Sequence, residues 1–219
     1  MRKVNAKRIC EVAGECPWTY AKLDKKGAAE RPHAMVPGAG CTDKPIVMLI
    51  GEAPGQMEDI SGVPFVGPSG DELNMYLRTH AKISRQHCYI TNLVKCFPGK
   101  GKTPSKTLID YCATYYLFIE VVSVEPQVIV TLGALAASWL ADRKTLMERV
   151  HGIPQYSPIL HRDFLPIYHP ASGIYSPRTM HAIINDFRTM GDWVRGQVER
   201  PADIPHDYRI AKGGLVPCG

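Results

Sequence analysis

The chain has 219 residues, and 45% of them are hydrophobic, which is enough for one sizeable core and favours a single domain. A formal net charge of +5 and a pI of about 8.8 permit a nucleic-acid partner without requiring one. No apolar run approaches the length of a membrane span, and no apolar signal core follows the basic residues 1–8, so we expect neither a membrane protein nor a secreted one.

The first 45 residues lack a strong periodicity. They contain Cys10, Cys16 and Cys41 among many Lys, Gly, Pro and Ala residues. A segment this irregular needs something to hold it to the folded body, and a shared metal site would serve. In a chain without a secretion signal, cysteines indicate thiols or metal ligands more often than a disulfide framework.

Apolar runs alternate with helical patterns from residue 46 onward. The predicted strands are 46–50, 88–91, 128–132 and 164–168. The predicted helices begin at Ser69, Ser105, Ala134 and near Ser176. Ser69 and Glu72 have the spacing of a capping box, which predicts the start of the first helix. Because Pro166 cannot donate to a neighbouring strand, we expect the last strand at an edge of the sheet.

Continuous apolar strands that alternate with helices are typical of a parallel sheet covered by helices on both faces. The sequence therefore predicts the α/β class, with a three-layer α/β/α arrangement around a central, mostly parallel four-stranded sheet. We expect one domain over residues 1–198, in which residues 1–45 are an N-terminal segment. Residues 199–219 are predicted to be a loose C-terminal tail.

Residues 51–70 are predicted to be a long loop, rich in Gly and Pro, between the first strand and the first helix. In open α/β sheets, ligands bind at the carboxyl ends of the strands, which is where this loop begins. The loop carries Phe65, while Asn92 and His169 directly follow the second and fourth strands. We therefore expect these three side chains to meet at one edge of the sheet.

An aromatic ring, an amide and an imidazole together suit a pyrimidine base. Phe65 can stack on a flat ring, and the Asn92 amide has the donors and the acceptor to read a base edge. His169 can donate to an oxygen on which negative charge develops. The loops also carry lysines suited to phosphates, among them Lys95 and Lys102. Taken singly, each residue is more often structural, but their joint placement favours a base flipped out of a nucleic acid.

The motifs that contain these residues resemble those of the family-four uracil-DNA glycosylases, the branch that contains an iron–sulfur cluster. The resemblance covers residues 46–190, with the motifs in the family's order and spacing. The motifs are Gly51-Glu52-Ala53-Pro54-Gly55, Glu58-Asp59, Gly62-Val63-Pro64-Phe65-Val66-Gly67, Tyr89-Ile90-Thr91-Asn92, Lys95-Cys96 and His169-Pro170. The long first motif is highly specific, and the short ones gain weight from their order.

The resemblance implies a monofunctional DNA glycosylase that hydrolyses the N-glycosidic bond of uracil in DNA and leaves an abasic site. It implies that Phe65 stacks on uracil, that Asn92 hydrogen-bonds the polar edge of the base, and that His169 donates toward a uracil oxygen as the base leaves. Glu58 would lie near the ring edge that the methyl group of thymine would occupy.

The residue that activates water is left open. Ala53, in the predicted uracil-binding motif, stands where other uracil-DNA glycosylases carry an Asp for this purpose. Glu52 is the nearest candidate to position or polarise the water and the base. We expect no catalytic metal.

The segment after His169 matches the family's DNA-entering loop. The resemblance implies that Ile174 or Tyr175 wedges into the base stack and that Ser172 and Arg178 hold phosphates. An ordinary loop before a helix is the competing interpretation. The full set of predicted DNA contacts is Ser69, Lys102, Ser172, Ile174, Tyr175 and Arg178.

Cys96 and Cys112 match the family's second pair of cluster ligands. The family's first pair is usually Cys-x-x-Cys, whereas five residues separate Cys10 from Cys16 here. The resemblance implies a structural [4Fe–4S] cluster on these four cysteines, which would bind the segment 1–45 to the body. The alternatives are Cys41 in place of one of the first two, and a zinc ion in place of the cluster.

The expected partner is uracil-containing DNA, single- or double-stranded, bound by a monomer in the cytoplasm of a prokaryotic, archaeal or viral-host cell. A related branch captures uracil covalently through a His at the position of Gly101, which speaks against covalent capture here. A catalytically silent DNA-binding or replication accessory module has no need of Phe65, Asn92 and His169. A small-molecule nucleotide binder would explain the Gly-rich loop but not those three side chains.

Overall fold

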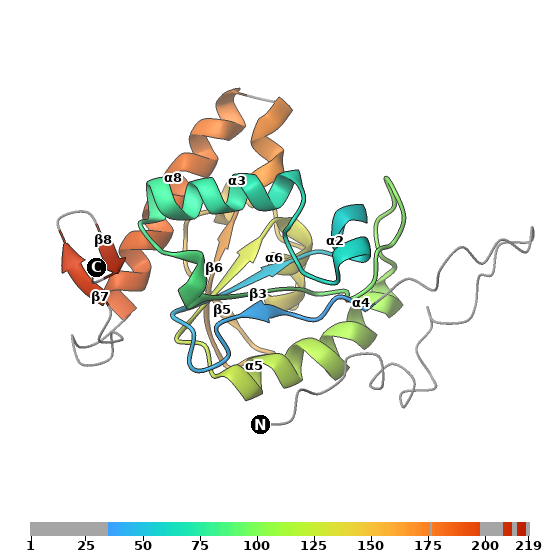
Figure 1. Ribbon diagram of the computed structural model, residues 1–219. Helices are drawn as coiled ribbons and strands as arrows, with labels where there is room; N and C mark the ends of the chain where they lie inside the picture. The colour runs from blue at the N-terminus through green and yellow to red at the C-terminus, as the bar shows by residue number, and fades with distance from the viewer. Residues whose placement is uncertain (1–34, 176, 198–207, 212–213, 218–219) are drawn as a thin grey trace, which may run out of the picture.

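The protein is described by a computed structural model, which covers residues 35–175, 177–197, 208–211 and 214–217. A mixed sheet with the strand order β1-β3-β2-β4-β6-β5 forms its centre. Helices cover both faces of the sheet, with α3 and α8 above it and α4 and α5 below it in Figure 1. The predicted α/β class and its three layers are confirmed.

The four predicted strands form the parallel centre of the sheet. They are β2 (Val47–Gly51), β3 (Cys88–Asn92), β4 (Val128–Leu132) and β6 (Arg162–Ile167). Every neighbouring pair among them is parallel, and all residues of β2, β3 and β4 are buried. Burial on both faces explains why these strands are continuous apolar runs in the sequence.

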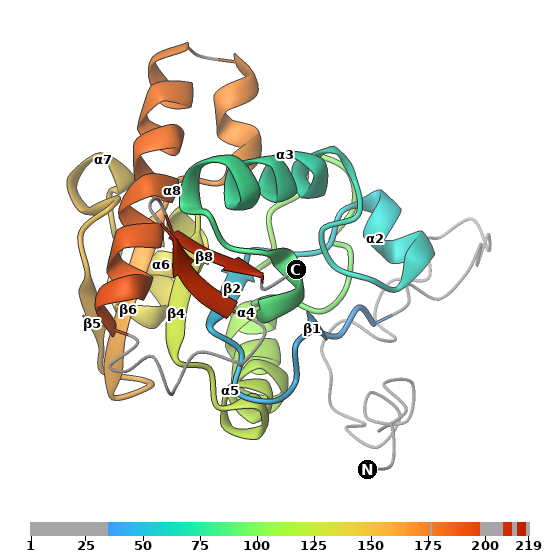
Figure 2. The ribbon, with the colours of Figure 1, turned by 60° about the vertical axis from the view of Figure 1, so that its left-hand side comes forward.

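The sheet has six strands instead of the predicted four, because a short antiparallel strand lies at each edge (Figure 2). They are β1 (Ala39–Gly40), which pairs with β3, and β5 (Gln155–Ser157), which pairs with β6. The prediction that the strand with Pro166 lies at an edge is therefore wrong. Proline is tolerated because β5 pairs only with residues 162–164, so that Pro166 has a neighbouring strand only on the side of β4.

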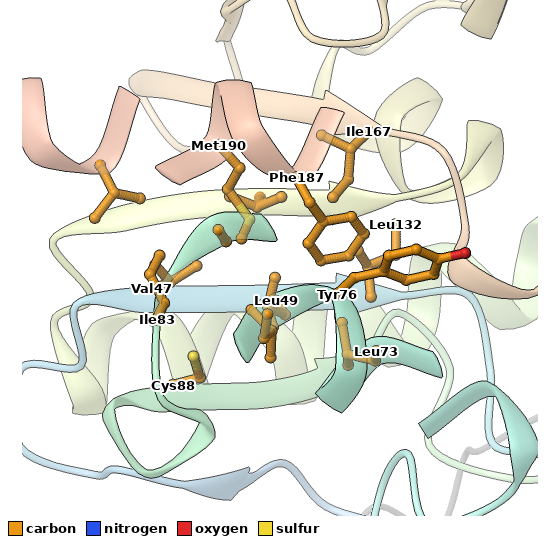
Figure 3. Close-up of a cluster of buried hydrophobic side chains, with 14 of the residues drawn as sticks. Val47, Leu49, Leu73, Tyr76, Ile83, Cys88, Leu132, Ile167, Phe187 and Met190 are labelled. Carbon is orange, nitrogen blue, oxygen red and sulfur yellow. The ribbon is translucent and has the colours of Figure 1, made fainter. Parts of the chain in front are cut away.

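One face of the sheet is covered by α3 (Pro68–Tyr76), the π-helical turn η1 (Leu77–Ala81) and α8 (Pro177–Gln197). On α8, every third or fourth residue is apolar and fully buried: Ile183, Phe187, Met190 and Val194. Figure 3 shows Phe187 beside Tyr76 of α3, with the ring centroids 5.1 Å apart. This layer holds α3, and with it the end of the 51–70 segment, against the sheet.

The opposite face is covered by a continuous helix made of α4 (Lys106–Cys112), the π-helical turn η3 (Ala113–Leu117) and α5 (Phe118–Val124). The helices α6 (Ala134–Leu140) and α7 (Met147–Val150) complete this layer. Contrary to the expectation from the sequence, the 19-residue helix Lys106–Val124 passes as a membrane span by length and composition alone. Its buried residues Leu108, Cys112 and Leu117 pack against the sheet, which is the pattern of a core helix.

Of the two capping residues predicted from the sequence, Ser105 is confirmed and Ser69 is not. Ser105 caps α4 as predicted, because its Oγ accepts a hydrogen bond from the N–H of Leu108 at 3.3 Å. The capping box at Ser69 is wrong. Helix α3 begins one residue earlier at Pro68, whose fixed φ suits the first helical position, and Glu72 hydrogen-bonds Tyr76 on its own helix.

The predicted 51–70 loop also contains a short helix, α2 (Gln56–Ser61), which the sequence analysis did not separate from the loop. The last helix begins at Pro177 as predicted, while Ser176 lies outside the described residues. Within the range predicted as a loose tail, β7 (Tyr208–Ala211) and β8 (Gly214–Pro217) form an antiparallel hairpin, and β8 contacts α8. The predicted domain boundaries stay a prediction.

Candidate active site

A pocket of about 310 Å³ lies at the carboxyl ends of β2, β3 and β6. Six predicted site residues line it: Ala53, Glu58, Phe65, Ser69, Asn92 and His169. The parallel register explains part of this, because Gly51 at the end of β2 pairs with Asn92 at the end of β3. The structure thus brings together residues that are up to 116 positions apart, since Ala53 and His169 share one pocket.

Phe65 is held in an unusual backbone conformation, with a φ of 54°. Two contacts hold the loop there. Gly70 lies so close that a Cβ on it would be 2.0 Å from the carbonyl oxygen of Phe65, and Arg85 Nη2 donates to the carbonyl of Pro64 at 2.9 Å. The ring centroid of Phe65 is consequently fixed 5.9 Å from that of His169. The pocket has a preformed aromatic wall.

Asn92 is 2% exposed, and its side-chain oxygen Oδ1 is buried with no hydrogen-bond partner among the described residues. A buried, unpartnered acceptor is uncommon in native proteins and is explained when a ligand supplies the donor. Gly51 is required beside it, because a Cβ there would lie 2.4 Å from Asn92 Oδ1 and 2.8 Å from the Phe65 ring. The pocket therefore presents a hydrogen-bond acceptor to an N–H group of a ligand that packs against Phe65.

Burial lowers the pKa of His169 to about 4, so its ring is neutral at physiological pH. Its Nδ1 accepts a hydrogen bond from the backbone N–H of Ala171 at 3.2 Å. A neutral imidazole that accepts at Nδ1 carries its proton at Nε2. The local turn after β6 thus selects the tautomer that can donate from Nε2.

Glu58 lies on α2 and braces the loop that follows Phe65. Its Oε1 accepts hydrogen bonds from the N–H groups of Val66 at 3.0 Å and Gly67 at 2.9 Å. The carboxylate is buried, and it also lines the pocket. It therefore has a structural task in addition to any contact with a ligand.

Replacing Glu58 by alanine should lower the free energy of unfolding by about 3 kcal/mol, because two backbone N–H groups lose a charged acceptor. Glu58→Gln keeps a carbonyl oxygen for the same bonds and should lose less than half as much. Urea denaturation followed by circular dichroism measures both. A Glu58→Ala protein as stable as the wild type would show that this carboxylate does not hold the loop.

The remaining predicted residues lie elsewhere. Glu52 is half-buried, and burial raises its pKa, but it is not among the residues that line the pocket. Lys102 and Ser172 are exposed outside the pocket lining. Lys95, grouped with the phosphate-binding lysines from the sequence, is 1% exposed and cannot reach a phosphate at the surface. The side chains of Ile174, Tyr175 and Arg178 lie outside the described part of the chain.

Sequence reasoning missed five residues that line the pocket: Gly55, Gln56, Met57, Gly67 and Pro68. They lie at the starts of α2 and α3, where Gly55 and Gly67 are the N-caps, and these two glycines also end two of the motifs quoted from the sequence. Sequence reasoning also missed Glu120, whose carboxylate accepts hydrogen bonds from the side chains of Thr91 and Lys95 at the end of β3.

Two of the four predicted cluster ligands can be placed. Cys96 and Cys112 are both buried, and Cys112 packs in the same cluster as Val94, two residues before Cys96. The described chain starts beside them, because the N–H of Val36 donates to the carbonyl of Lys95 at 2.7 Å. Within the described ranges no group of three or more metal-binding side chains occurs, and Cys10 and Cys16 lie outside those ranges. Buried thiols next to the entering N-terminal segment fit the donor set of a four-thiolate group.

Cys41 is badly placed to replace Cys10 or Cys16. Its N–H donates to the carbonyl of Cys88 at 3.0 Å, and Cys88 is the first residue of β3. Cys96 comes four residues after Asn92, the last residue of β3, and the ends of a five-residue strand are roughly 13 Å apart. Cys41 and Cys96 therefore lie at opposite ends of the strand.

Comparison with known proteins identifies the relatives of this chain. The family model of the uracil DNA glycosylase superfamily matches residues 37–188. The chain is 38% identical over 159 residues to a type-4 uracil-DNA glycosylase of Saccharolobus solfataricus, which covers 70% of this chain and 73% of that protein. It is 33% identical over 165 residues to that of Archaeoglobus fulgidus, which covers 72% and 80% respectively. It is 37% identical over 138 residues to that of Thermotoga maritima, which covers 63% and 70%. The chain belongs to the uracil DNA glycosylase superfamily and, within it, to the type-4 family.

Proposed function

We propose that the protein is a uracil-DNA glycosylase, which accepts a uracil flipped out of DNA, hydrolyses its N-glycosidic bond and leaves an abasic site. The observation that carries the proposal is the buried, unpartnered Oδ1 of Asn92 in a pocket that Phe65 and a neutral His169 also line. Uracil has an N3–H donor that this acceptor needs, and cytosine has an acceptor at the same ring position. The names of the related type-4 proteins support the same activity.

In the proposed mechanism, Phe65 stacks on the uracil ring and Asn92 binds its polar edge, with Oδ1 accepting from N3–H and the amide nitrogen donating to O4. As the bond between the base and the sugar breaks, negative charge develops on the base. His169 Nε2–H donates to the uracil O2 and stabilises that charge in a site from which water is largely excluded. Water then adds to the sugar carbon, which carries positive charge in a dissociative transition state.

Glu52 stays our candidate to position the attacking water. It directly precedes the pocket-lining Ala53, and burial raises its pKa, which makes its carboxylate a better proton acceptor than an exposed one. Glu58 is placed by its contacts to the loop 66–67 at the wall of the pocket, where it would limit the space for a methyl group on the base. We therefore assign the exclusion of thymine to Glu58, which also braces the loop that follows Phe65.

DNA is the proposed partner in single- or double-stranded form, which the net charge of +5 supports. We infer that Ser69, Lys102, Ser172 and Arg178 contact phosphates and that Ile174 or Tyr175 fills the space left by the flipped base. Ser69 is supported by its position in the pocket lining next to the first residue of α3. We expect the protein to be a monomer that acts in the cytoplasm.

We infer that Cys96 and Cys112, together with Cys10 and Cys16, hold a structural [4Fe–4S] cluster. The buried positions of the first two thiols and the contact of Val36 with Lys95 support this set. When bound, such a group supplies a cross-link between the N-terminal segment and the body of the protein. Cys41, at the far end of β3, is left out of the set.

Replacing Cys112 by serine should abolish the broad visible absorption of an iron–sulfur cluster and lower the bound iron by at least half, because one of four thiolates is lost. Cys41→Ser is the matched control and should leave the spectrum and the iron content unchanged. Absorption spectra and metal analysis of protein purified without oxygen measure both. Bound zinc without visible absorption in the wild type would replace the cluster by a zinc site, and bleaching in Cys41→Ser would return Cys41 to the ligand set.

The function itself is tested with a labelled oligonucleotide that contains one uracil. The purified protein is incubated with this DNA, treated with alkali and analysed on a denaturing gel. Cleavage at uracil, and none at thymine or cytosine in the same context, is the expected result. A gel shift without cleavage would favour a silent DNA-binding module, and a DNA–protein band that survives denaturation would indicate covalent capture.

A further inference from the structure

A buried lysine, Lys95, contacts the backbone of Asn92, the proposed base-reading residue. The ammonium of Lys95 has three protons and three acceptors: Thr91 Oγ1 at 2.6 Å, the backbone carbonyl of Asn92 at 2.8 Å and Glu120 Oε2 at 2.7 Å. A buried ammonium is stabilised only when such partners are complete. The arrangement uses every donor of Lys95 inside the protein.

Glu120, on α5, gathers contacts from three parts of the chain. Its Oε2 accepts from Lys95 and also from the hydroxyl of Thr91 at 2.7 Å. Its Oε1 accepts from the backbone N–H of Gly38 at 2.8 Å, and the hydroxyl of Tyr89 hydrogen-bonds the same carboxylate. The two oxygens thus connect the end of β3, the helix beneath the sheet and the segment that enters from the N-terminal side.

The backbone around this ion pair is the support of the pocket. The N–H of Leu93 donates to the carbonyl of Gly51 at 2.9 Å, and that of Val94 to the carbonyl of Glu52 at 3.0 Å. The chain therefore leaves β3 still bonded to the residues that open the pocket. Lys95 also donates to the backbone carbonyl of Asn92. The backbone that carries the Asn92 side chain is therefore held by hydrogen bonds to both β2 and Lys95.

We propose that Lys95 and Glu120 are positioning residues, which act on base recognition by holding the end of β3 so that the Asn92 amide stays in register with the bound base. The proposal rests on the proposed function of Asn92 and extends it to two residues that do not line the pocket. It also explains why a lysine in a loop of a DNA-binding protein is buried instead of exposed to phosphates.

The test removes both charges together, because removal of one would leave the other in the interior without its opposite charge. The Lys95→Met/Glu120→Gln variant is compared with wild type, and the same pair of changes is made in an Asn92→Ala protein. The matched control is Lys44→Met. Lys44 pairs with Glu125 at the end of α5, but both side chains are about two-thirds exposed, at 69% and 66%.

If the ion pair acts through Asn92, its loss should lower kcat/KM for uracil excision about tenfold in wild type and less than twofold in the Asn92→Ala background. The loss should fall mainly on kcat, and Lys44→Met should change neither background. An equal fold-loss in both backgrounds would overturn the proposal, because the ion pair would then act independently of Asn92.

Hydrogen–deuterium exchange provides a second readout that needs no glycosylase activity. The amides of Leu93 and Val94 should exchange faster in Lys95→Met/Glu120→Gln than in wild type, and those of the control should not. Unchanged exchange would overturn the proposal even if activity falls. A wild-type protein that does not excise uracil would overturn the proposed function instead, and exchange would still decide whether the ion pair holds the end of β3. If the double variant does not fold, Lys95→Met alone takes its place in both measurements, because Glu120 then keeps the donors of Thr91, Gly38 and Tyr89.

Discussion

Asn92→Ala should lower kcat/KM for uracil excision by about 10²- to 10³-fold, which corresponds to the loss of paired polar contacts in a buried site. In the free protein the Asn92 Oδ1 is buried without a partner among the described residues, so its hydrogen bond forms only when a base enters. The substitution therefore removes an interaction of the bound complex without breaking one within the fold. Single-turnover kinetics on a uracil-containing duplex and a single strand measure the effect.

DNA affinity is the control for Asn92. The residue is 2% exposed at the bottom of the pocket and makes no contribution to the charged surface that meets the phosphates. Binding of Asn92→Ala to DNA without uracil should match that of wild type within a factor of two, as should its salt dependence. Parallel losses of excision and of binding to undamaged DNA would show that Asn92 supports the DNA interface and does not read the base.

His169→Ala should lower the excision rate at pH 7 by about 10²- to 10³-fold, the range for removal of one preorganised donor to a developing anion. The wild-type rate should be nearly independent of His169 ionisation from pH 8 to pH 5, because burial places its pKa at about 4. Toward pH 4 the rate should fall. A protonated ring has a proton on Nδ1 as well, and that proton would face the N–H of Ala171 where Nδ1 now accepts.

The same pKa shift has a consequence for stability. The pKa of His169 in the folded state is lower than the value of 6.5 in an unfolded chain, so the unfolded state takes up the proton first. The ionisation of His169 does not affect the free energy of unfolding above pH 6.5, and it lowers that free energy as the pH falls from 6.5 toward 4. His169→Ala should remove this part of the acid sensitivity, measured as melting temperature against pH. A midpoint near pH 6.5 in the excision profile of the wild type would contradict a His169 that is neutral at physiological pH.

The central strands were predictable because each is a run of apolar residues buried on both faces, which is a strong local pattern. The edge strands were not, because β1 has two residues and β5 has three, and both are partly exposed. The start of α3 was misplaced for a similar reason. The spacing of Ser69 and Glu72 is a valid capping signal, yet Pro68 at the preceding position takes the first helical place and Glu72 bonds to Tyr76.

For the site, the sequence placed Phe65, Asn92 and His169 correctly at one edge, because the ends of parallel strands must meet there. It did not reveal the φ of Phe65 or the tautomer of His169, which depend on Gly70, Arg85 and Ala171. It also assigned Lys95 to the surface. A lysine beside a basic, Gly-rich loop gives no local sign that a glutamate 25 residues further along the chain will meet it inside the protein.

The short strands at the two edges of the sheet also affect how molecules of this protein meet one another. A long exposed edge would present a row of unpaired backbone groups on which a strand of a second molecule could assemble. Here β1 caps β3 with two residues and β5 caps the first half of β6 with three, so neither border offers a template of useful length. Removal of residues 39 and 40 would uncover β3, all of whose residues are buried, and we expect the exposed border to become a site of aggregation.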